Sequence, residues 1–360
     1  MKQWLETREV LARLAELKRE GRRAALATVV RVRGSAYRHE GAKMLVAADG
    51  TTTGNVSGGC LEADVREVAL KVLEGSGKAD VRSYCAGSDE IVAWDLGVGC
   101  EGEVQVLLEP AEDDRAVERA LLDGTAPFAA CASLDEPSRR LVVTTERTKG
   151  TLGDPRLDAS AVTIARRALG AGSSAVHTIE GRDVFIDVFL PPPRLVIVSG
   201  GEDARPLAAF GSAIGFKVIV VDRRPGLLTR QRFPHAGELV TAAPDDLARL
   251  VALGPETFAV VMTHNYADDR VYVRALLDTN VAYIGVLGPR QRTDRMLAEL
   301  AAHRPVNESR IYGPIGLDIG TDGAEQVAIS ALSEILAVRS GRRPSSLRER
   351  RQPIHVDAGG

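Results

Sequence analysis

Short apolar runs alternate with amphipathic segments throughout the second half of the chain. The apolar runs predict buried strands at 195–198, 218–221, 258–262 and 281–287. Apolar residues at helical spacing predict helices at 204–214, 247–253, 271–277, 290–301 and 324–338. Strands that are apolar on both faces and alternate with helices are typical of a parallel, doubly wound sheet. We therefore expect a Rossmann-like domain whose ligands bind at the carboxyl ends of the strands.

The first half mixes helices and strands without this regular alternation. Amphipathic spacing predicts helices at 4–20, 61–73 and 116–122. Runs of strand-forming residues predict strands at 24–32, 44–47, 51–56, 81–85, 91–94, 104–108, 141–145 and 184–190. Asp49-Gly50 predicts a hairpin turn. The fold class expected for this half is a mixed α/β domain.

Three consecutive prolines, Pro191-Pro192-Pro193, separate the two patterns. A run of prolines forms a semi-rigid, extended connector, so we place the main domain boundary there. The predicted organisation is a mixed α/β domain at 1–190, a proline linker at 191–193, a Rossmann-like domain at 194–340 and a flexible, arginine-rich tail at 341–360.

Composition excludes several classes of partner. Lys and Arg number 46 and Asp and Glu 49, a net charge of −3, so no electrostatic attraction to nucleic acid or to a membrane surface is expected. Aromatic residues make up only 4%, which leaves little for base stacking. The first residues lack the apolar core of a signal peptide, and no apolar run is long enough to span a membrane. We expect a cytoplasmic protein.

The four cysteines, Cys60, Cys85, Cys100 and Cys131, are widely spaced. None forms a C-x-x-C pair, so a zinc ribbon or a thioredoxin-like redox site is not indicated. The spacing of iron–sulfur ligands is absent as well. Glycine is the unusual residue: the chain has 35, above the usual share of about 7%. Clustered glycines mark tight turns and close backbone approach.

The turn after the strand at 195–198 partly matches the dinucleotide fingerprint G-x-G-x-x-G/A. In residues 199–204, Gly201 and Ala204 fit the second and third positions, whereas Ser199 replaces the first glycine. Asp222 lies where the ribose-binding carboxylate of such folds is found. The acidic pair in this turn would repel a pyrophosphate, so a Rossmann-type scaffold without NAD(P) is favoured, and an NAD(P)-dependent oxidoreductase is the alternative.

Further polar residues follow the later strands of this half. His264 lies after the strand at 258–262, which favours a site role, with a helix-capping loop at 263–265 as the alternative. Asp268 and Asp269 open a helix and are interpreted as partners of its dipole. The arginines of the next helix, at positions 290, 292 and 295, are expected on a solvated face.

Glycine-rich blocks in both halves resemble those of one protein family. Gly54-Asn55-Val56-Ser57-Gly58-Gly59-Cys60-Leu61-Glu62 resembles its G-x-x-x-G-G-C-x-E signature, and Gly97-Val98-Gly99-Cys100-Glu101-Gly102 resembles its second cysteine turn. The remaining blocks are 33–36 with 41–44, 221–225, 263–265, 285–288 and 313–320. In this order, from about residue 24 to 338, they resemble the xanthine dehydrogenase accessory factor family (XdhC/CoxI). The turn at 199–204 departs from the family's G-A-G-H-x-A pattern, because Ser199 replaces the first glycine and Glu202 the histidine.

The resemblance implies a non-enzymatic cofactor chaperone. Such a protein binds the molybdenum cofactor (molybdopterin), holds it while a terminal sulfur is added, and delivers it to a molybdenum hydroxylase of the xanthine or carbon monoxide dehydrogenase type. A cysteine desulfurase-like sulfur donor is the second implied partner. The resemblance leaves open the client enzyme and whether the chain forms a homo-oligomer.

The cofactor's chemistry suggests roles for the glycine-rich residues. Gly54, Gly58 and Gly59 form a loop before a helix, where backbone N–H groups bind phosphate well. Cys60 at that helix N-terminus is expected to have a lowered pKa and to approach the metal, with a structural role as the alternative. Glu62 either orients a pterin amide or caps the helix.

Cys100 is the second candidate metal-contacting thiol, with a structural role weighed equally. Gly201, Asp222 and His264 are the candidate cofactor-binding residues of the second half. Cys131 lies in an apolar segment and is expected in the core.

Overall fold

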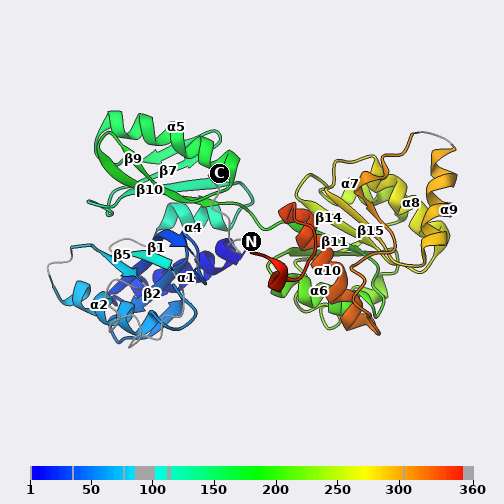
Figure 1. The fold of residues 1–360 in the computed structure, drawn as a ribbon, viewed down its shortest axis with the longest axis horizontal. Coiled ribbons are helices and arrows are strands. Elements are labelled where there is room, and N and C mark those ends of the chain that lie inside the picture. The colour runs from blue at the N-terminus through cyan, green and yellow to red at the C-terminus, as the bar shows by residue number, and fades with distance from the viewer. Residues whose placement is uncertain are drawn as a thin grey trace. The chain divides into compact units, whose positions relative to one another are not determined.

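The computed structural model describes residues 2–34, 36–75, 78–85, 102–111, 115–302 and 305–351. The chain divides between Pro191 and Pro192 into two compact units (Figure 1). The N-terminal unit holds Lys2–Pro191 together with the residues from Leu347 onward, and the C-terminal unit holds Pro192–Ser346. Each unit is described by itself.

An antiparallel sheet with strand order β3-β2-β1-β5-β4 forms the first layer of the N-terminal unit. Its strands are β1 (Ala24–Gly34), β2 (Lys43–Ala47), β3 (Thr52–Gly54), β4 (Asp80–Cys85) and β5 (Gly102–Pro110). Helix α2 (Glu62–Glu74) covers one face, where Val65 and Ala69 pack on Ala25, Val29 and Met44. The apolar spacing that predicted this helix is the face that it buries.

A second antiparallel sheet has the order β8-β7-β6-β10-β9. Its strands are β6 (Phe128–Ser133), β7 (Arg140–Thr144), β8 (Thr148–Gly150), β9 (Ala175–Ile179) and β10 (Arg182–Phe189). Helix α5 (Pro155–Ala171) covers its outer face through Leu157, Ala161 and Ala165. Pattern reading expected neither this helix nor β6, β8 and β9.

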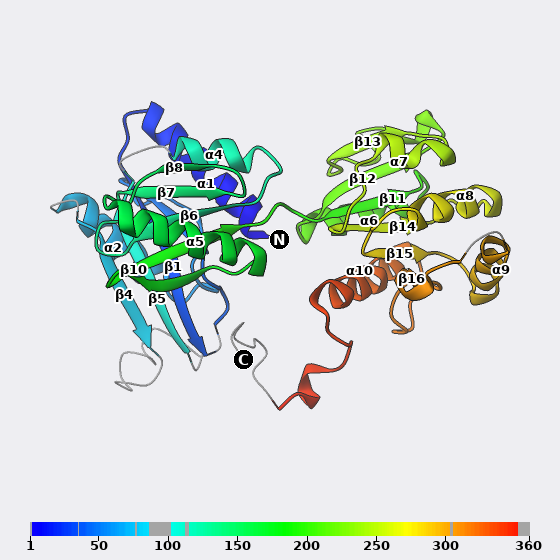
Figure 2. The same ribbon diagram turned by 90° about the horizontal axis from the view of Figure 1, so that it is seen from above.

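The two sheets face each other, giving the layers α2, sheet, sheet and α5 (Figures 1 and 2). Helices α1 (Lys2–Arg19) and α4 (Ala116–Leu122) pack into the same core. There the ring of Phe128 meets Trp4 edge-on at 5.8 Å and stacks on Phe189 at 4.6 Å. This core joins both sheets into one body.

The C-terminal unit is built on a six-stranded parallel sheet of order β13-β12-β11-β14-β15-β16. The strands are β11 (Arg194–Val198), β12 (Lys217–Asp222), β13 (Glu238–Thr241), β14 (Thr257–Val261), β15 (Tyr283–Val286) and β16 (Ile311–Tyr312). Helices α6 (Ala204–Ala213) and α10 (Ala324–Ser340) cover one face, and α7 (Leu247–Leu250), α8 (Tyr266–Leu277) and α9 (Arg290–Ala301) cover the other. The predicted doubly wound parallel sheet is confirmed. The short edge strands β13 and β16 were not expected from the sequence.

The strand order in this unit reverses between β11 and β14, because β12 follows β11 on one side and β14 lies on the other. Ligands of open parallel sheets bind at such a switch point, beyond the carboxyl ends of the strands. The turn at 199–203 and the segment at 262–265 lie there. No described helix is long and apolar enough to cross a membrane.

Candidate functional site

The glycine-rich loop of the N-terminal unit runs from the end of β3 to the start of α2. Gly54 has φ +80°, and a Cβ there would lie 2.3 Å from the carbonyl oxygen of Lys43. Gly59 has φ +118°, with no atom within 4 Å of an added Cβ. Both positions favour glycine, but only Gly54 needs it for space. Gly59 lies at an open, exposed part of the loop.

Glu62 holds this loop in shape from the first turn of α2. Its Oε1 accepts hydrogen bonds from the N–H groups of Val56 at 3.2 Å and Ser57 at 2.8 Å, and its Oε2 accepts one from the Ser57 hydroxyl. Ser57 Oγ in turn accepts from the N–H groups of Gly59 and Leu61, each at 3.1 Å. Burial acts to raise the pKa of Glu62, but the hydrogen bonds from Ser57 outweigh it and hold that pKa below its usual value. These hydrogen bonds stabilise the loop before α2, and a role of Glu62 in orienting a pterin amide stays a prediction.

The hydrogen bonds of the loop leave its outer edge available. Within the part of the chain that the structure describes, the N–H groups of Gly58 and Cys60 have no acceptor. Cys60 is a half-buried free thiol that packs against the core under α2. The ring of Tyr37 lies next to Gly58, since a Cβ added at Gly58 would be 3.4 Å from Tyr37 Cγ. Tyr37 is 73% exposed. Two N–H donors and an aromatic ring therefore lie at one exposed edge, next to the half-buried Cys60.

Cys131 differs from Cys60. Cys131 is fully buried on β6, and burial raises the pKa of its thiol to about 12, which leaves it a core residue as expected. Cys100, the second candidate thiol, lies outside the described residues. Among the described residues, no group of three or more His, Cys, Asp or Glu side chains could hold a metal ion by itself.

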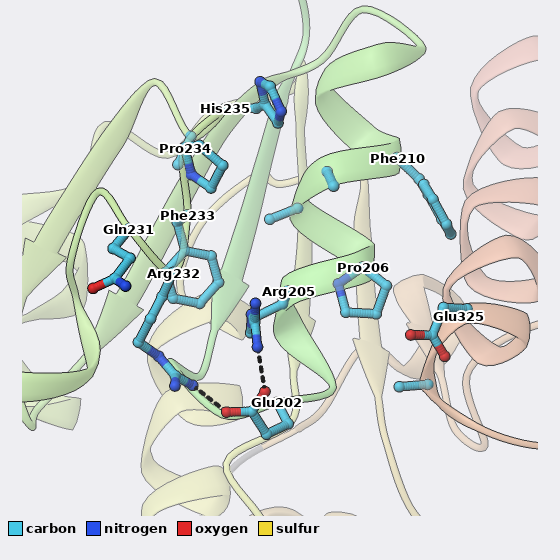
Figure 3. A pocket seen from close by; sticks show the side chains of 14 residues that line it. Glu202, Arg205, Pro206, Phe210, Gln231, Arg232, Phe233, Pro234, His235 and Glu325 are labelled. Atoms are coloured by element: carbon cyan, nitrogen blue, oxygen red, sulfur yellow. Dashed lines mark hydrogen bonds and ion pairs between the residues drawn. The ribbon is translucent and has the colours of Figure 1, made fainter.

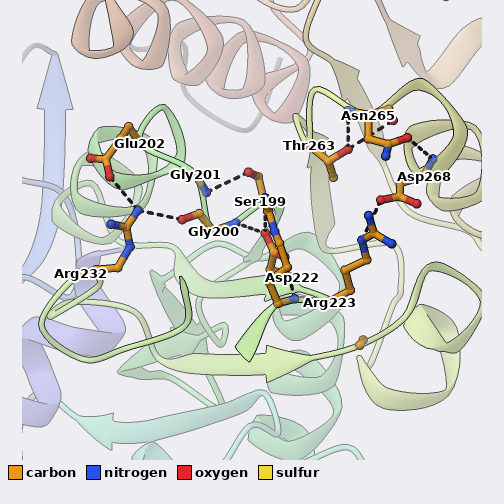
Figure 4. A network of polar contacts seen from close by, with 12 residues as sticks. Ser199, Gly200, Gly201, Glu202, Asp222, Arg223, Arg232, Thr263, Asn265 and Asp268 are labelled. Carbon is orange, nitrogen blue, oxygen red and sulfur yellow. Dashed lines mark hydrogen bonds and ion pairs between the residues drawn. The ribbon is translucent and has the colours of Figure 1, made fainter. Parts of the chain in front are cut away.

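At the switch point of the C-terminal unit, Asp222 is turned inward (Figure 4). It ends β12, is 3% exposed, and its Oδ2 accepts the Gly200 N–H at 2.7 Å. Its Oδ1 accepts from the Arg224 N–H at 2.8 Å and Nε at 2.9 Å. Burial acts to raise the pKa of Asp222, but the hydrogen bonds from Arg224 and Gly200 lower it below its usual value. Both oxygens are engaged within the protein, so this geometry gives no support to ribose binding or to the alternative of an NAD(P)-dependent oxidoreductase.

The acidic turn before α6 is balanced by arginines. Glu202 forms ion pairs with Arg205 at 2.7 Å and with Arg232 at 2.8 Å. The hydrogen bonds from these two arginines hold the pKa of Glu202 below its usual value. Gly201 donates its N–H to Ser199 Oγ at 3.0 Å, so the serine that replaces the first glycine closes the turn through its side chain.

His264 lies in a helix-capping loop, one of its two predicted interpretations, and its role in a site stays a prediction. Its Nε2 lies 2.9 Å from Asp203 Oδ2, which joins the ends of β14 and β11 across the switch point. Its φ is +61°, a left-handed conformation that is costly for a residue with a Cβ. The next residue, Asn265, caps α8 by accepting the Asp268 N–H at 3.1 Å.

The charged residue Arg292 differs from its expected place on a solvated face, because its side chain is only 20% exposed. Its partner Asp269 lies in the first turn of α8, where a partner of the helix dipole was expected, and it is fully buried there. Asp269 accepts hydrogen bonds from the Thr263 N–H at 3.2 Å and from Arg292 at 2.6 Å. Asp269 shares the apolar face of α8 with Tyr272, Val273 and Leu276, and that spacing was a readable signal of burial.

The predicted site residues thus form two groups. Gly54, Gly58, Gly59, Cys60 and Glu62 lie together in the N-terminal unit, and Gly201, Asp222 and His264 lie together in the C-terminal unit.

Comparison with known proteins gives matches over nearly the whole chain. A model of the XdhC and CoxI family matches residues 17–84, and a model of the XdhC Rossmann domain matches residues 195–335. The chain is similar to a Bacillus subtilis protein named as a probable subunit of xanthine dehydrogenase, with 34% identity over 88% of this chain and 93% of the relative. It is also similar to the molybdenum cofactor insertion chaperone PaoD of Escherichia coli, with 25% identity over 92% of this chain and 88% of that protein. A crystal structure described as that of a xanthine dehydrogenase from Bacillus halodurans has 30% sequence identity and a TM-score of 0.76, covering 94% of this chain and 98% of that one.

Proposed function

This chain belongs to the XdhC and CoxI family, and we propose that it is an accessory factor that binds the molybdenum cofactor, holds it for sulfuration and delivers it to a molybdenum hydroxylase. Two relatives support this role, one named as a molybdenum cofactor insertion chaperone and the other as part of a xanthine dehydrogenase. The cofactor is cargo here, so the protein's task is to bind and release it. A sulfur donor of the cysteine desulfurase type is the second partner in this proposal.

The observation that carries the proposal is the exposed edge at Tyr37, Gly58 and Cys60. Molybdopterin combines a phosphate, a planar pterin and a metal held by sulfur, and the edge offers a partner for each. The N–H groups of Gly58 and Cys60 suit a phosphate oxygen, because both lie just before the N-terminus of α2. The Tyr37 ring suits a planar ring, and the Cys60 sulfur suits a soft metal.

Cofactor retention by the purified protein tests this proposal. The full chain is mixed with molybdenum cofactor released from a molybdenum enzyme, and molybdenum and pterin are measured in the protein fraction after gel filtration. We expect stoichiometric retention by the wild type. Removing an outer-shell partner of a bound metal already costs about tenfold in affinity, so Cys60→Ala is expected to lose at least that much.

Cys131→Ala is the matched control, because it removes a thiol that is fully buried and cannot reach a ligand. Cys100→Ala, in parallel, tests the second candidate thiol. If the wild type retains neither molybdenum nor pterin, the proposal is wrong. If Cys60→Ala and Cys131→Ala retain equal amounts of cofactor, Cys60 has no part in binding.

A further inference from the structure

The C-terminal unit lacks a helix where folds of its type usually have one. Parallel strands are normally joined by a crossover helix, but residues 223–237, all of them described, join β12 to β13 with one short 3-10 turn, η1 (Pro225–Leu227). The neighbouring helix α6 is therefore covered only by an irregular segment on this side. A groove of about 500 Å³ lies there, within the range of small-molecule sites.

The groove extends over the exposed side of α6, from the segment at 231–236 to the start of α10 (Figure 3). Its charged end holds Glu202, Arg205 and Arg232. The rest of the lining is mainly apolar and consists of proline, phenylalanine and alanine side chains: Pro206, Ala208, Ala209, Phe210, Phe233, Pro234, Ala236 and Ala324. The other polar groups are Gln231, His235 and Glu325. A ligand that fits this lining has one anionic end and a flat or apolar body.

Two arginines share one carboxylate at the charged end. Arg205 Nη1 lies 2.7 Å from one oxygen of Glu202, and Arg232 Nη2 lies 2.8 Å from the other. Arg232 also donates to the Gly200 carbonyl at 3.0 Å, which fixes it against the turn. The Glu202 side chain is 67% exposed, and ion pairs at that exposure contribute little free energy. A stronger anion can therefore displace Glu202 from both arginines at small cost.

The usual phosphate position of a Rossmann turn is closed in this chain. The Gly200 N–H is taken by Asp222, and a Cβ at Gly200 would lie 2.7 Å from Leu227 Cβ, so η1 packs directly on the turn. Two cations lie beside that turn, Arg205 in the first turn of α6 and Arg232, whose guanidinium donates to the Gly200 carbonyl. Guanidinium groups pair well with phosphate, and the N-terminal end of α6 adds favourable dipole charge.

We propose that this groove binds a phosphomonoester with a planar or apolar body, whose phosphate replaces the Glu202 carboxylate between Arg205 and Arg232. Glu202 is then an internal competitor of the ligand. The residues of this groove belong to the C-terminal unit and those of the Cys60 loop to the N-terminal unit, so cofactor retention that depends on Cys60 tests the accessory function independently of this groove. The phosphomonoester is either a nucleotide or the molybdenum cofactor, whose phosphate would then be held here and not by the N–H groups of Gly58 and Cys60, and the experiment distinguishes these sources.

Calorimetric titration of the full chain with inorganic phosphate, phenyl phosphate and AMP tests the site. We expect phenyl phosphate or AMP to bind more tightly than inorganic phosphate, because the body adds contact with the apolar lining. Arg205→Gln and Arg232→Gln are each expected to weaken that binding about tenfold through loss of a charged hydrogen bond. Glu202→Gln is expected to tighten it about fivefold, because the internal competitor loses its charge.

The chain offers a matched control in Asp246 and Arg249, an ion pair at 2.9 Å with the same spacing of three residues as Glu202 and Arg205. Asp246→Asn changes the net charge by the same amount as Glu202→Gln, and Arg249→Gln by the same amount as Arg205→Gln or Arg232→Gln. Both control variants are expected to leave phosphomonoester binding unchanged. If Arg249→Gln and Arg232→Gln weaken phosphomonoester binding equally, the effect is one of surface charge in general and the proposal is wrong. The proposal is also wrong if Glu202→Gln binds the phosphomonoester more weakly than the wild type. Equal affinities for inorganic phosphate and the two esters would overturn it as well.

Molybdenum cofactor retention by Arg232→Gln identifies the source of the phosphate. Loss of retention, together with phenyl phosphate binding but no AMP binding, assigns the groove to the cofactor. Unchanged retention with AMP binding assigns it to a nucleotide.

Discussion

Glu62 and Ser57 determine what the glycine-rich loop can offer a ligand. Between them they satisfy the N–H groups of Val56, Ser57, Gly59 and Leu61. The donors that remain, on Gly58 and Cys60, are therefore those beside the free thiol. The charge of the carboxylate at position 62 strengthens the hydrogen bonds that it accepts.

The pH dependence of stability should report this role of Glu62. In the folded chain its pKa lies below its usual value of 4.5, so between the two values the unfolded chain binds more protons. The stabilisation is thus complete above pH 4.5 and is lost as the pH falls through the folded pKa. Because Glu62 is only partly buried, we expect Glu62→Gln to cost only about 1 kcal/mol at pH 7.

Urea unfolding of wild type and Glu62→Gln at pH 7, 5 and 4, followed by tryptophan fluorescence, measures this difference. Trp4 is buried in the core of the N-terminal unit, and both tryptophans, Trp4 and Trp94, precede the prolines in the sequence, so the fluorescence follows that part of the chain. Glu67→Gln is the control, since Glu67 is exposed on the same helix and 3.9 Å from its nearest cation, Lys71. A difference between wild type and Glu62→Gln that stays constant down to pH 4 would contradict the assignment.

At the scale of the element, comparing Gly54 with Gly59 in the glycine-rich loop distinguishes the cost of backbone strain from the cost of a steric clash. Both have positive φ, but only at Gly54 would a Cβ meet backbone, the Lys43 carbonyl oxygen at 2.3 Å. We expect Gly59→Ala to cost about 1 kcal/mol, the strain of the left-handed region. Gly54→Ala should cost about 3 kcal/mol, because the pairing of β2 with β3 must shift as well.

Urea unfolding measures both costs, and cofactor retention measures the effect on the loop. We expect Gly54→Ala to lose retention through distortion of β3, whereas Gly59→Ala should retain its fold. Equal costs for the two variants would mean that the contact with Lys43 does not restrict Gly54.

Elements with large apolar residues at a clear period were predictable from the sequence, and those built from small residues were not. Helices α1, α2 and α9 show Leu, Val and Met at helical spacing. Helix α5 was missed because its buried face is mostly alanine, which does not form a distinct apolar pattern. Its capping signals were present: Asp154 accepts from the N–H groups of Arg156 and Leu157, Pro155 follows, and Gly172 ends the helix in a left-handed conformation.

The candidate site was predictable to the same limited extent. The glycine loop and its thiol could be located because they are contiguous in sequence. The inward turn of Asp222 could not, because it depends on Gly200 and Arg224 converging on one carboxylate in three dimensions. The groove beside α6 arises from a helix that is absent between β12 and β13, and pattern reading does not reveal the space this leaves.

At the scale of the whole molecule, the apolar clusters divide with the chain. The clusters around α6, α8 and α10 contain residues only from 195 onward, whereas those of the two antiparallel sheets end at Phe189. Leu14 and Leu195 are both fully buried. Leu14 packs in the core that α1 shares with the two antiparallel sheets, and Leu195 packs in a core of the parallel sheet. Because no described cluster crosses the prolines, we expect the two units to unfold in separate transitions.

Leu14→Ala and Leu195→Ala form a matched pair for this expectation. Each removes the same atoms from a fully buried position and should cost about 3 kcal/mol, the transfer term plus that of the cavity left behind. Because Trp4 packs in the same cluster as Leu14, Leu14→Ala should shift the urea midpoint of tryptophan fluorescence and leave part of the circular dichroism transition unmoved. Leu195→Ala should leave the fluorescence midpoint unchanged and shift only circular dichroism. If the fluorescence midpoint moves equally in both variants, the two units unfold as one. A loss of stability at β11 would then lower the midpoint that Trp4 reports.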